Sequence, residues 1–268
     1  VRAYKATYEP NTLLSHLSTV IQFGKDVVVN TSGDITNEPI ATKLASPAMG
    51  WTPSASAFST PSQWLPNGSG GATVWHTETG RQMLGDFNGD GKSDYMWIPK
   101  GTQNWWVSAS PGQTENIVSS VVTGLGGETT ITYAPSTQWP NTQLPFSVQR
   151  VSAITTCDNW NGTTCAGLSS TTTYSYAGGF YHLGARDLRG VNYVKVTGQA
   201  ATNGDQTISE TWFHQGSRVD AADESLAELQ ADTAAFTKGL PFRTRVTDQT
   251  GRVYSDTTTI YTADADGV

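Results

Sequence analysis

LSSTTTYSYAGG (residues 168–179) and VNYVKVTGQA (residues 191–200) are the stretches that decide the fold. In both, polar or hydroxyl residues alternate with apolar or aromatic ones, and QTISETWFHQ (residues 206–215) continues the pattern. A period of two places successive side chains on opposite faces of a β-strand. Long antiparallel pairing is the simplest account of three such stretches in succession.

The same pattern extends in both directions and predicts an all-β fold of antiparallel strands. Runs of Thr, Val, Tyr and Trp end at Gly, Pro and Asn, which favours strands over helices. We expect the first three strands to form a meander. The other expected strands follow the same composition, and the full set covers residues 1–9, 17–24, 25–30, 72–76, 95–99, 104–110, 117–127, 128–135, 147–155 and two strands within 240–261.

One segment departs from the strand pattern and predicts a short helix near residues 220–236. Leu226, Leu229 and Phe236 supply a sparse apolar stripe at helical spacing. Gly239 follows the expected end, where a glycine commonly terminates a helix. We interpret this helix as an excursion between two strands.

The composition excludes several functions. The chain has 268 residues and a formal net charge of −7, and its Lys and Arg residues form no cluster. Nucleic-acid binding needs a concentrated basic surface, so we expect no nucleic-acid partner. No run approaches the roughly 18–20 consecutive apolar residues of a membrane span, so none is expected. Because residues 1–8 already alternate like a strand, we interpret the chain as part of a longer protein.

The loop DFNGDGKSD (residues 86–94) is a candidate calcium site. Ca²⁺ takes about six to eight oxygen ligands, and oxygens at alternate loop positions can surround one ion. The expected ligands are the side chains of Asp86, Asn88, Asp90 and Asp94 and the backbone carbonyl of Lys92. Trp97 stands where a helix-flanked calcium loop has its final Glu, so the loop is not an EF-hand. We expect the ion to have a structural role.

The alternative for this loop is a hairpin turn without an ion. Asn88-Gly89 and Asp90-Gly91 are both strong turn dipeptides. A bare turn needs no further carboxylates, however, and three crowded carboxylates would repel one another without a cation. We therefore favour Ca²⁺ as the expected cofactor.

Cys157 and Cys165 bracket a turn-rich stretch and could close a small disulfide loop in an oxidising compartment. The alternative is a pair of free thiols in a hairpin.

No residues are predicted to be catalytic. The chain contains no nucleophile elbow, phosphate loop or dinucleotide fingerprint, and its four histidines have no metal-ligand spacing. Glu210 and His214 would share one face of a strand at a separation of roughly 13 Å, which is beyond proton-transfer reach. We therefore expect no catalysis by this chain alone.

The nine tryptophans raise a second hypothesis, a carbohydrate-binding or carbohydrate-active β module with a possible glycan ligand. We expect Trp75, Trp97 and Trp212 to fill a core, because alternating apolar residues flank them. Trp105 and Trp106 must face opposite ways on one strand, so one of them could be exposed. Within the long surface connection expected over residues 31–71, Trp51 and Trp64 are possible anchors.

Several stretches also resemble known families. GDFNGDGKSDYMWIPKG (residues 85–101) resembles the FG-GAP/VCBS calcium-loop repeat of β-propeller blades, and the first 24 residues resemble the end of the SpvB-type domain. Residues 123–255 are similar to the middle region of insecticidal toxin-complex B subunits and related Rhs/YD-repeat proteins. The segments that carry this likeness are TGLGGETTITY, LPFSVQRVSAITTCDNWNGTTC, TTTYSYAGGFYHLGARDLRGVNYVKVT, ETWFHQ and KGLPFRTRVTDQTGRVYS.

This resemblance implies a scaffold and container. In that family the B subunit contributes a β-propeller and part of a hollow β-shell around a toxic C-terminal region. The implied organisation is an SpvB/FG-GAP-like region with a propeller-blade-like part over residues 1–115 and a long-stranded β-shell or sandwich region over residues 116–268. The implied protein is a secreted or surface-located bacterial toxin component, and its partners are the remainder of its own chain or a toxin-complex subunit.

Two departures from the family pattern stand out. Only one complete calcium-loop unit is present, which is too few to build a propeller alone. The family's Arg-x-Phe-Arg-Gly-Phe motif appears here as Arg186-Asp187-Leu188-Arg189-Gly190-Val191, so its aromatic packing is expected to differ.

Overall fold

The structure is a computed structural model of the chain, which folds into two compact units of three segments each. Unit 1 comprises Val1–Gly80, Ile98–Thr132 and Ile154–Ser170, and unit 2 comprises Arg81–Trp97, Tyr133–Ala153 and Thr171–Val268. The residues that the structure describes are 3–10, 14–38, 41–53, 62–63, 80–100, 105–111, 114–140, 143–216 and 235–262. The predicted division at residues 115 and 116 stays a prediction.

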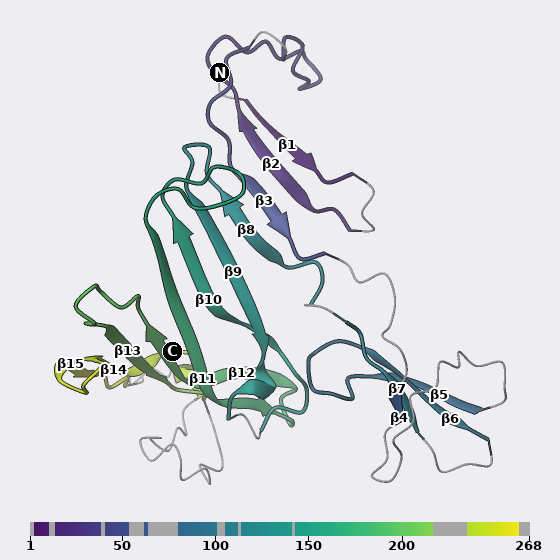
Figure 1. Cartoon of the computed structure of the whole chain (residues 1–268), viewed down its shortest axis with the longest axis vertical. Coiled ribbons are helices and arrows are strands. Elements are labelled where there is room, and N and C mark those ends of the chain that lie inside the picture. Colours follow the sequence, from purple (N-terminus) through teal and green to yellow (C-terminus); the bar gives the residue numbers. More distant parts are fainter. Residues whose placement is uncertain are drawn as a thin grey trace. The chain divides into compact units, whose positions relative to one another are not determined.

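The described residues form two antiparallel sheets, which confirms the predicted all-β class (Figure 1). The large sheet has eleven strands, in the order β1 (Tyr4–Tyr8), β2 (Leu17–Gln22), β3 (Ala48–Trp51), β8 (Val118–Val122), β9 (Glu128–Pro135), β10 (Gln149–Cys157), β11 (Ser169–His182), β12 (Asp187–Thr197), β13 (Thr207–Phe213), β14 (Pro241–Asp248) and β15 (Val253–Thr258). The small sheet has the order β4 (Ser62–Gln63), β7 (Trp106–Ser108), β6 (Asp94–Pro99) and β5 (Gly80–Gly85).

Helical structure within the described ranges is limited to two short 3-10 turns, η1 (Ser136–Gln138) and η3 (Ala235–Thr237). The helix predicted near residues 220–236 lies outside the described residues except where it overlaps η3. In the part of the chain that is described, no helix has the length and apolar character needed to cross a membrane.

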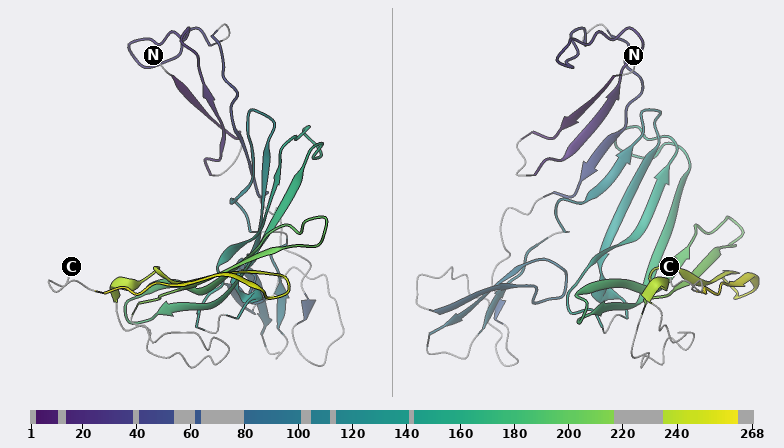
Figure 2. Two further views of the ribbon diagram at one scale, coloured as in Figure 1. Left: turned by 90° about the vertical axis from the view of Figure 1, so that its left-hand side faces the viewer. Right: turned by 180° about the vertical axis from the view of Figure 1, so that it is seen from behind.

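The alternating stretches that opened the sequence analysis form the central part of unit 2. Tyr174, Tyr176 and Ala177 of β11 lie opposite Val196, Val194 and Tyr193 of β12. The next strands continue the ladder through β13, β14 and β15, which lie side by side in every view (Figures 1 and 2). Long antiparallel pairing is therefore confirmed.

Cross-strand pairs on one face of these strands surround Trp212, which is buried as predicted. The guanidinium groups of Arg243 and Arg245 lie 5.0 and 5.7 Å from the Trp212 ring, and each also pairs with a carboxylate. Arg243 forms an ion pair with Asp256 at 2.7 Å, and Arg245 forms one with Glu210 at 2.9 Å. Such pairs across neighbouring strands contribute to the stability of a sheet.

Unit 1 has a small core of its own, the Phe23 cluster, defined as the buried residues Phe23, Val27 and Ala41. Another anchor is Trp51, whose ring stacks on His16 at 4.7 Å and whose indole N–H donates to the Leu17 carbonyl. The predicted anchor role of Trp51 is thus confirmed, whereas Trp64 lies outside the described residues.

Two other tryptophan predictions are confirmed and one falls outside the described residues. Trp97 is buried, and Trp105 is 42% exposed next to the half-buried Trp106. Trp75 lies outside the described residues.

The predicted disulfide between Cys157 and Cys165 is confirmed, with a Cα–Cα distance of 5.8 Å. It links the end of β10 to the loop that leads into β11. The backbone of this loop is also held by an N–H group of Trp160 that donates to the Gly126 carbonyl at 2.6 Å. The two free thiols considered as the alternative are excluded.

The strand predicted over residues 25–30 is wrong. This segment forms turns with one isolated bridge between Val29 and Ile35. Side chains take the place of a strand ladder, because Asn37 accepts from the Val28 N–H and donates to the Asp26 carbonyl. Backbone groups satisfied by side chains do not need a neighbouring strand.

The long connection predicted over residues 31–71 contains a strand, β3, which pairs with β8 in the large sheet. The chain leaves this sheet after β3 and returns at β8. Thr52 holds the two ends together, because its N–H donates to the Ile117 carbonyl and its Oγ1 accepts from the Ile117 N–H at 3.1 Å. Thr52 is only 2% exposed, so these hydrogen bonds are shielded from water.

Replacing Thr52 with Val keeps the side-chain shape but removes the acceptor for the Ile117 N–H. We expect the free energy of unfolding to fall by about 1–3 kcal/mol, the cost of an unsatisfied buried donor. Urea denaturation of both proteins measures the change. Thr257→Val on the exposed strand β15 is the matched control and should stay within about 0.5 kcal/mol of the wild type. Equal effects of the two substitutions would contradict the role of Thr52.

Candidate functional site

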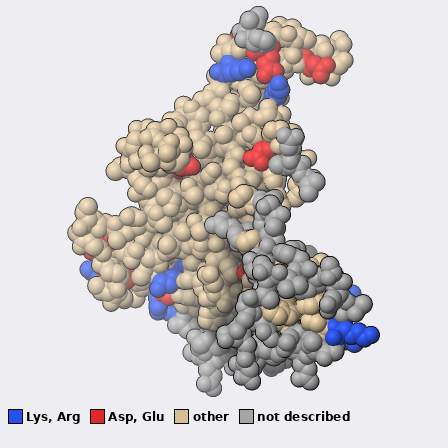
Figure 3. Space-filling model, turned by 45° about the vertical axis from the view of Figure 1, so that its right-hand side comes forward, with Lys and Arg blue, Asp and Glu red and all other residues tan. Residues whose placement is uncertain are grey.

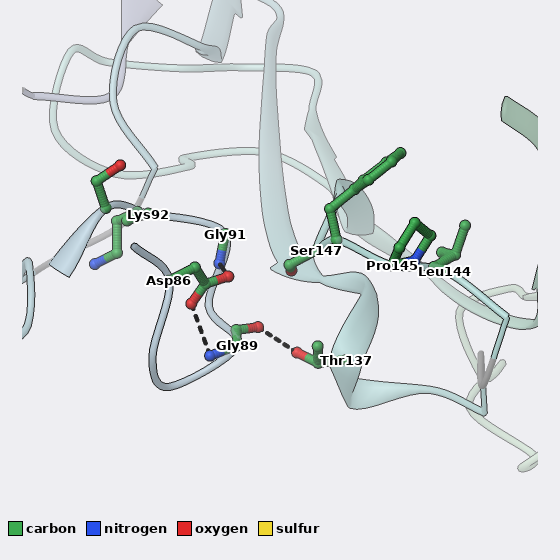
Figure 4. A pocket seen from close by; sticks show the side chains of 10 residues that line it. Asp86, Gly89, Gly91, Lys92, Thr137, Leu144, Pro145 and Ser147 are labelled. Atoms are coloured by element: carbon green, nitrogen blue, oxygen red, sulfur yellow. Dashed lines mark hydrogen bonds between the residues drawn. The ribbon is translucent and has the colours of Figure 1, made fainter. Parts of the chain in front are cut away.

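The acidic loop, residues 86–94, connects β5 to β6 and folds around its first carboxylate. Asp86 Oδ1 accepts from the N–H of Gly89 at 2.7 Å (Figure 4) and from the N–H of Asp90 at 3.0 Å. Asp86 Oδ2 accepts from the N–H of Gly91 at 2.8 Å. Three backbone donors thus converge on one carboxylate, which fixes the shape of the loop.

The second carboxylate, Asp90, is neutralised within the loop. Its Oδ1 accepts from the Lys92 N–H at 2.9 Å, and its Oδ2 lies 3.2 Å from the Lys92 ammonium. The Asn88 amide donates to the same Oδ2 at 3.1 Å. Lys92 therefore contributes a charged side chain that the sequence prediction, which used only its carbonyl, did not include.

The third carboxylate, Asp94, begins β6 and is fully buried, with 0% exposure. Its Oδ2 accepts from the Phe87 N–H at 3.0 Å, which closes the loop across its base. A buried carboxylate needs such partners, because an uncompensated charge is costly away from water.

The donor set of this loop has the chemistry of a hard-cation site, but the three carboxylates do not converge on one point. Oxygens of Asp86, Asp90 and Asp94 do not all lie within 4.8 Å of one another. Among the described residues, the one cluster of three potential ligands is Cys157, Asp158 and Cys165. Its two sulfur atoms already form the disulfide, so this cluster is not a metal site.

Carbonyl groups on the outside of the acidic loop accept hydrogen bonds from η1 and from the first residue of β10. Thr137 Oγ1 donates to the Gly89 carbonyl, and Gln149 Nε2 donates to the Asp90 carbonyl. Neither partner was predicted, because nothing in the sequence near Thr137 or Gln149 indicates a contact some 50 residues away. The loop is therefore an attachment point within unit 2.

Gly91 is required at the point of closest approach. Its φ of +83° lies in the left-handed region, which favours glycine. A Cβ atom at Gly91 would also lie 2.9 Å from Gln149 Nε2 and 3.3 Å from Ser147 Oγ. A side chain at this position would therefore displace the Gln149 amide that donates to the Asp90 carbonyl.

A pocket of about 520 Å³ lies between the acidic loop and residues 144–147 (Figure 4). Asp86 and Lys92 line its polar side, and Leu144, Pro145 and Phe146 line its apolar side. The pocket lies where the acidic loop contacts the neighbouring segment.

The acid–base pair that sequence reasoning considered and rejected does not form. Glu210 pairs with Arg245 and accepts from the Tyr193 hydroxyl at 2.6 Å. The His214 ring lies 4.7 Å from the Phe242 ring. Both side chains are engaged in cross-strand contacts rather than with each other.

The Arg186–Val191 motif is held mainly by charge. A hydrogen bond from Lys238 lowers the pKa of Asp187, and Arg189 lies 2.9 Å from the same carboxylate. Gln215, which is buried, donates to the carbonyls of Gly178 and Gly190. Its amide therefore connects the two left-handed glycines of β11 and β12.

Comparisons with known proteins give one family and a set of similar folds. The family model described as insecticide toxin TcdB middle/N-terminal region matches residues 55–218. The crystal structure of TcdB2-TccC3-TEV is 15% identical and has a TM-score of 0.51 over 86% of this chain. At this identity the likeness concerns the fold alone. A search of curated proteins found no match.

Two other solved structures have slightly lower TM-scores. The crystal structure of TcdB2-TccC3 without its hypervariable C-terminal region is 16% identical over 85% of this chain, with a TM-score of 0.49. The Tc holotoxin pore of Photorhabdus luminescens is 15% identical over 86%, also with a TM-score of 0.49. The present chain spans only 12%, 12% and 11% of the length of the three matched chains, in the order named.

Replacing Gly91 with Ala should destabilise the protein more than replacing Gly126 with Ala. Both glycines have left-handed φ angles, of +83° and +92°, so both substitutions carry a backbone cost of about 1–2 kcal/mol. Nothing lies within 4 Å of a Cβ at Gly126, whereas a Cβ at Gly91 displaces Gln149. Chemical denaturation measures the difference. Equal losses would show that the attachment of the loop contributes nothing to stability.

Proposed function

The chain belongs to the insecticide toxin TcdB middle/N-terminal region family, and we propose that it is a structural, encapsulating segment of a larger toxin-complex protein. The match of the family model over residues 55–218 is the observation that carries this proposal. This chain spans only 12% of the length of the matched TcdB2-TccC3-TEV chain. This supports a segment rather than a whole functional unit.

The proposed role suits a sheet of consecutive antiparallel strands. Such a sheet can form the wall of a shell, because each strand is hydrogen-bonded to its neighbours. The end strand β15 is exposed along its whole length, and an open edge can pair with a further strand. The finer likenesses, to SpvB and to an FG-GAP/VCBS propeller-blade repeat, are also part of this proposal.

A second subunit is the proposed partner of the longer protein. The matched crystal structure of TcdB2-TccC3-TEV contains TcdB2 together with TccC3. By analogy, we expect the protein that contains this chain to assemble with a TccC-like subunit and to be secreted by, or displayed on, a bacterium. The disulfide between Cys157 and Cys165 supports an oxidising destination.

The scaffold role predicts that this chain has no turnover on esters, glycosides, peptides or nucleotides. Instead, Gly91→Ala in the longer protein should reduce assembly with its partner subunit, measured by co-elution in size-exclusion chromatography. Gly126→Ala is the control and should reduce assembly less, in proportion to its smaller loss of stability. Saturable turnover abolished by one carboxylate or Ser substitution would overturn the scaffold proposal.

Calcium binding by the acidic loop is a finer proposal. Asp86, Asn88, Asp90, Asp94 and the carbonyl of Lys92 supply oxygen ligands of the kind that Ca²⁺ prefers. An ion would have to replace the Lys92 ammonium beside Asp90 and draw the carboxylates together. Bound to the folded protein only, it would stabilise the fold by mass action.

Competition between Ca²⁺ and the Lys92 ammonium gives a test of this site. Lys92→Met removes the competing charge, so calcium affinity should rise about tenfold in a calorimetric titration. Asp90→Ala should weaken binding, whereas Ser93→Ala, at an exposed loop position, should not. A melting temperature that is indifferent to calcium and to chelator in both the wild type and Lys92→Met would remove calcium from the proposal.

The second candidate function, a carbohydrate-binding or carbohydrate-active module, has one specific observation in its favour. Trp105 is 42% exposed, as an aromatic platform for sugar stacking would be. Glycan binding that is lost in Trp105→Ala would favour this candidate over a purely structural segment.

A further inference from the structure

Three potential metal ligands lie together in unit 1, where β10 leads into the segment before β11. One ligand atom from each of Cys157, Asp158 and Cys165 lies within 4.8 Å of the other two. Among the described residues, no other group of three His, Cys, Asp or Glu side chains comes this close. On the face drawn in Figure 3, the acidic side chains of the described residues are correspondingly few and scattered. We call the segment from residue 157 to residue 168 the cysteine hairpin.

Hydrogen bonds hold the cysteine hairpin together without the disulfide. The Asp158 N–H donates to the Leu168 carbonyl at 3.1 Å, and the Ala166 N–H donates to the Asn159 carbonyl at 2.8 Å. At the turn, Asn161 Oδ1 accepts from two backbone N–H groups at 2.9 and 2.8 Å. None of these contacts involves sulfur, so they keep the two cysteines opposite each other when the disulfide is reduced.

The carboxylate of Asp158 is held in a fixed position beside the sulfur atoms. Its Oδ1 accepts from the Leu168 N–H at 2.7 Å. A Cβ atom at Gly167 would collide with the same oxygen, so the absence of a side chain there leaves room for the carboxylate. Asp158 is exposed, and its Oδ2 forms no hydrogen bond within the described part of the chain. This oxygen is therefore free to bind an ion from solution.

Reduction of the disulfide frees the two sulfur atoms. A dithiol reductant gives two electrons and two protons to the disulfide and itself becomes a cyclic disulfide, which leaves Cys157 and Cys165 as thiols. Cys165 is half-buried, whereas Cys157 is only 7% exposed, so the reductant attacks the Cys165 sulfur first. The Cys157 sulfur is then the leaving group.

We propose that the reduced cysteine hairpin binds one Zn²⁺ ion through the Cys157 and Cys165 thiolates and the Asp158 carboxylate. Each thiol gives up its proton to solvent as the ion binds. Zn²⁺ accepts thiolate and carboxylate ligands in a tetrahedral arrangement, and with three protein ligands its fourth position is filled by water. Calcium and magnesium prefer oxygen ligands alone, so two thiolates select Zn²⁺ against them. In the oxidised chain both sulfurs are bonded to each other, so the site exists only after reduction.

The distance between the two cysteine backbones suits this site. Zn–S bonds of about 2.3 Å at tetrahedral angles place two thiolates roughly 3.8 Å apart. The Cα atoms of Cys157 and Cys165 are 5.8 Å apart, so rotation about the Cα–Cβ bonds can bring the thiolates to this separation without a change in the backbone. A cross-link between the cysteines also restrains Trp160, whose N–H donates to the Gly126 carbonyl at 2.6 Å. The ion would therefore preserve in a reducing compartment the contact that the disulfide preserves in an oxidising one.

The test compares the reduced and the oxidised forms of the complete chain. The reduced form is prepared with dithiothreitol and desalted without oxygen, and both forms are titrated first with Co²⁺ and then with Zn²⁺. The reduced chain should bind one Co²⁺, seen as a thiolate-to-cobalt charge-transfer band, and Zn²⁺ should displace it. Zn²⁺ should also raise the melting temperature of the reduced chain. The oxidised chain is the matched control, because it carries every other potential ligand, including the acidic loop, and it should show no such band.

Three variants test the individual ligands. In the double variant Cys157→Ser/Cys165→Ser, which keeps the hydrogen bonds of the hairpin, the band should be absent. Asp158→Asn should weaken Zn²⁺ binding by the reduced chain about tenfold or more, because even the loss of a group that only orients a metal ligand costs roughly 10–100-fold. Asp205→Asn, at an exposed position in the loop between β12 and β13, is its control and should bind like the wild type. Circular dichroism checks that each variant is folded.

The proposal is overturned if the reduced chain binds neither ion saturably, if the double variant or the oxidised chain gives the same band, or if Asp205→Asn weakens binding as much as Asp158→Asn. The zinc site does not depend on the proposed scaffold function, so any of these outcomes would leave the scaffold role unaffected.

Discussion

Antiparallel main-chain pairing between consecutive strands is the constraint on which the rest of this structure depends. Among the described residues, the buried hydrophobic ones are few and occur in both units, from Phe23 to Phe242, and most strand residues are only half-buried. Stability must therefore come largely from the strand ladder and from cross-strand pairs, such as those around Trp212. Because side chains alternate, a register slip by one residue would move each of them to the opposite face of the sheet.

The acidic loop is also held by hydrogen bonds, some within the loop and some to residues far along the chain. Its carboxylates bind its own backbone, which leaves the carbonyls of Gly89 and Asp90 free to point outward and accept from Thr137 and Gln149. A turn whose own side chains accept its backbone N–H groups can thus serve as a rigid attachment point. This arrangement explains the richness of the loop in carboxylates whether or not it also binds an ion.

Period-two alternation was enough to predict β11, β12 and β13, and cysteine spacing was enough to favour the disulfide that the structure contains. The five loop residues proposed as calcium ligands do lie in one loop, but their mutual arrangement depends on partners far along the chain. β3 was missed because its four residues become a strand through pairing with β2 and β8, which the local sequence does not show. Residues 25–30 were assigned wrongly because the Asn37 side chain satisfies the Val28 N–H and the Asp26 carbonyl, and composition does not show which side chain reaches which backbone group.

The closure at Thr52 also bears on how such a chain evolves. Because residues 52 and 117 lie side by side, the segment between them leaves and re-enters the large sheet at one place. An insertion with adjacent ends can be lengthened, exchanged or lost without a change in the pairing of β3 with β8. The connections of the small sheet can therefore change in length without altering the register of β3 with β8, provided that the acidic loop keeps its contacts with Thr137 and Gln149.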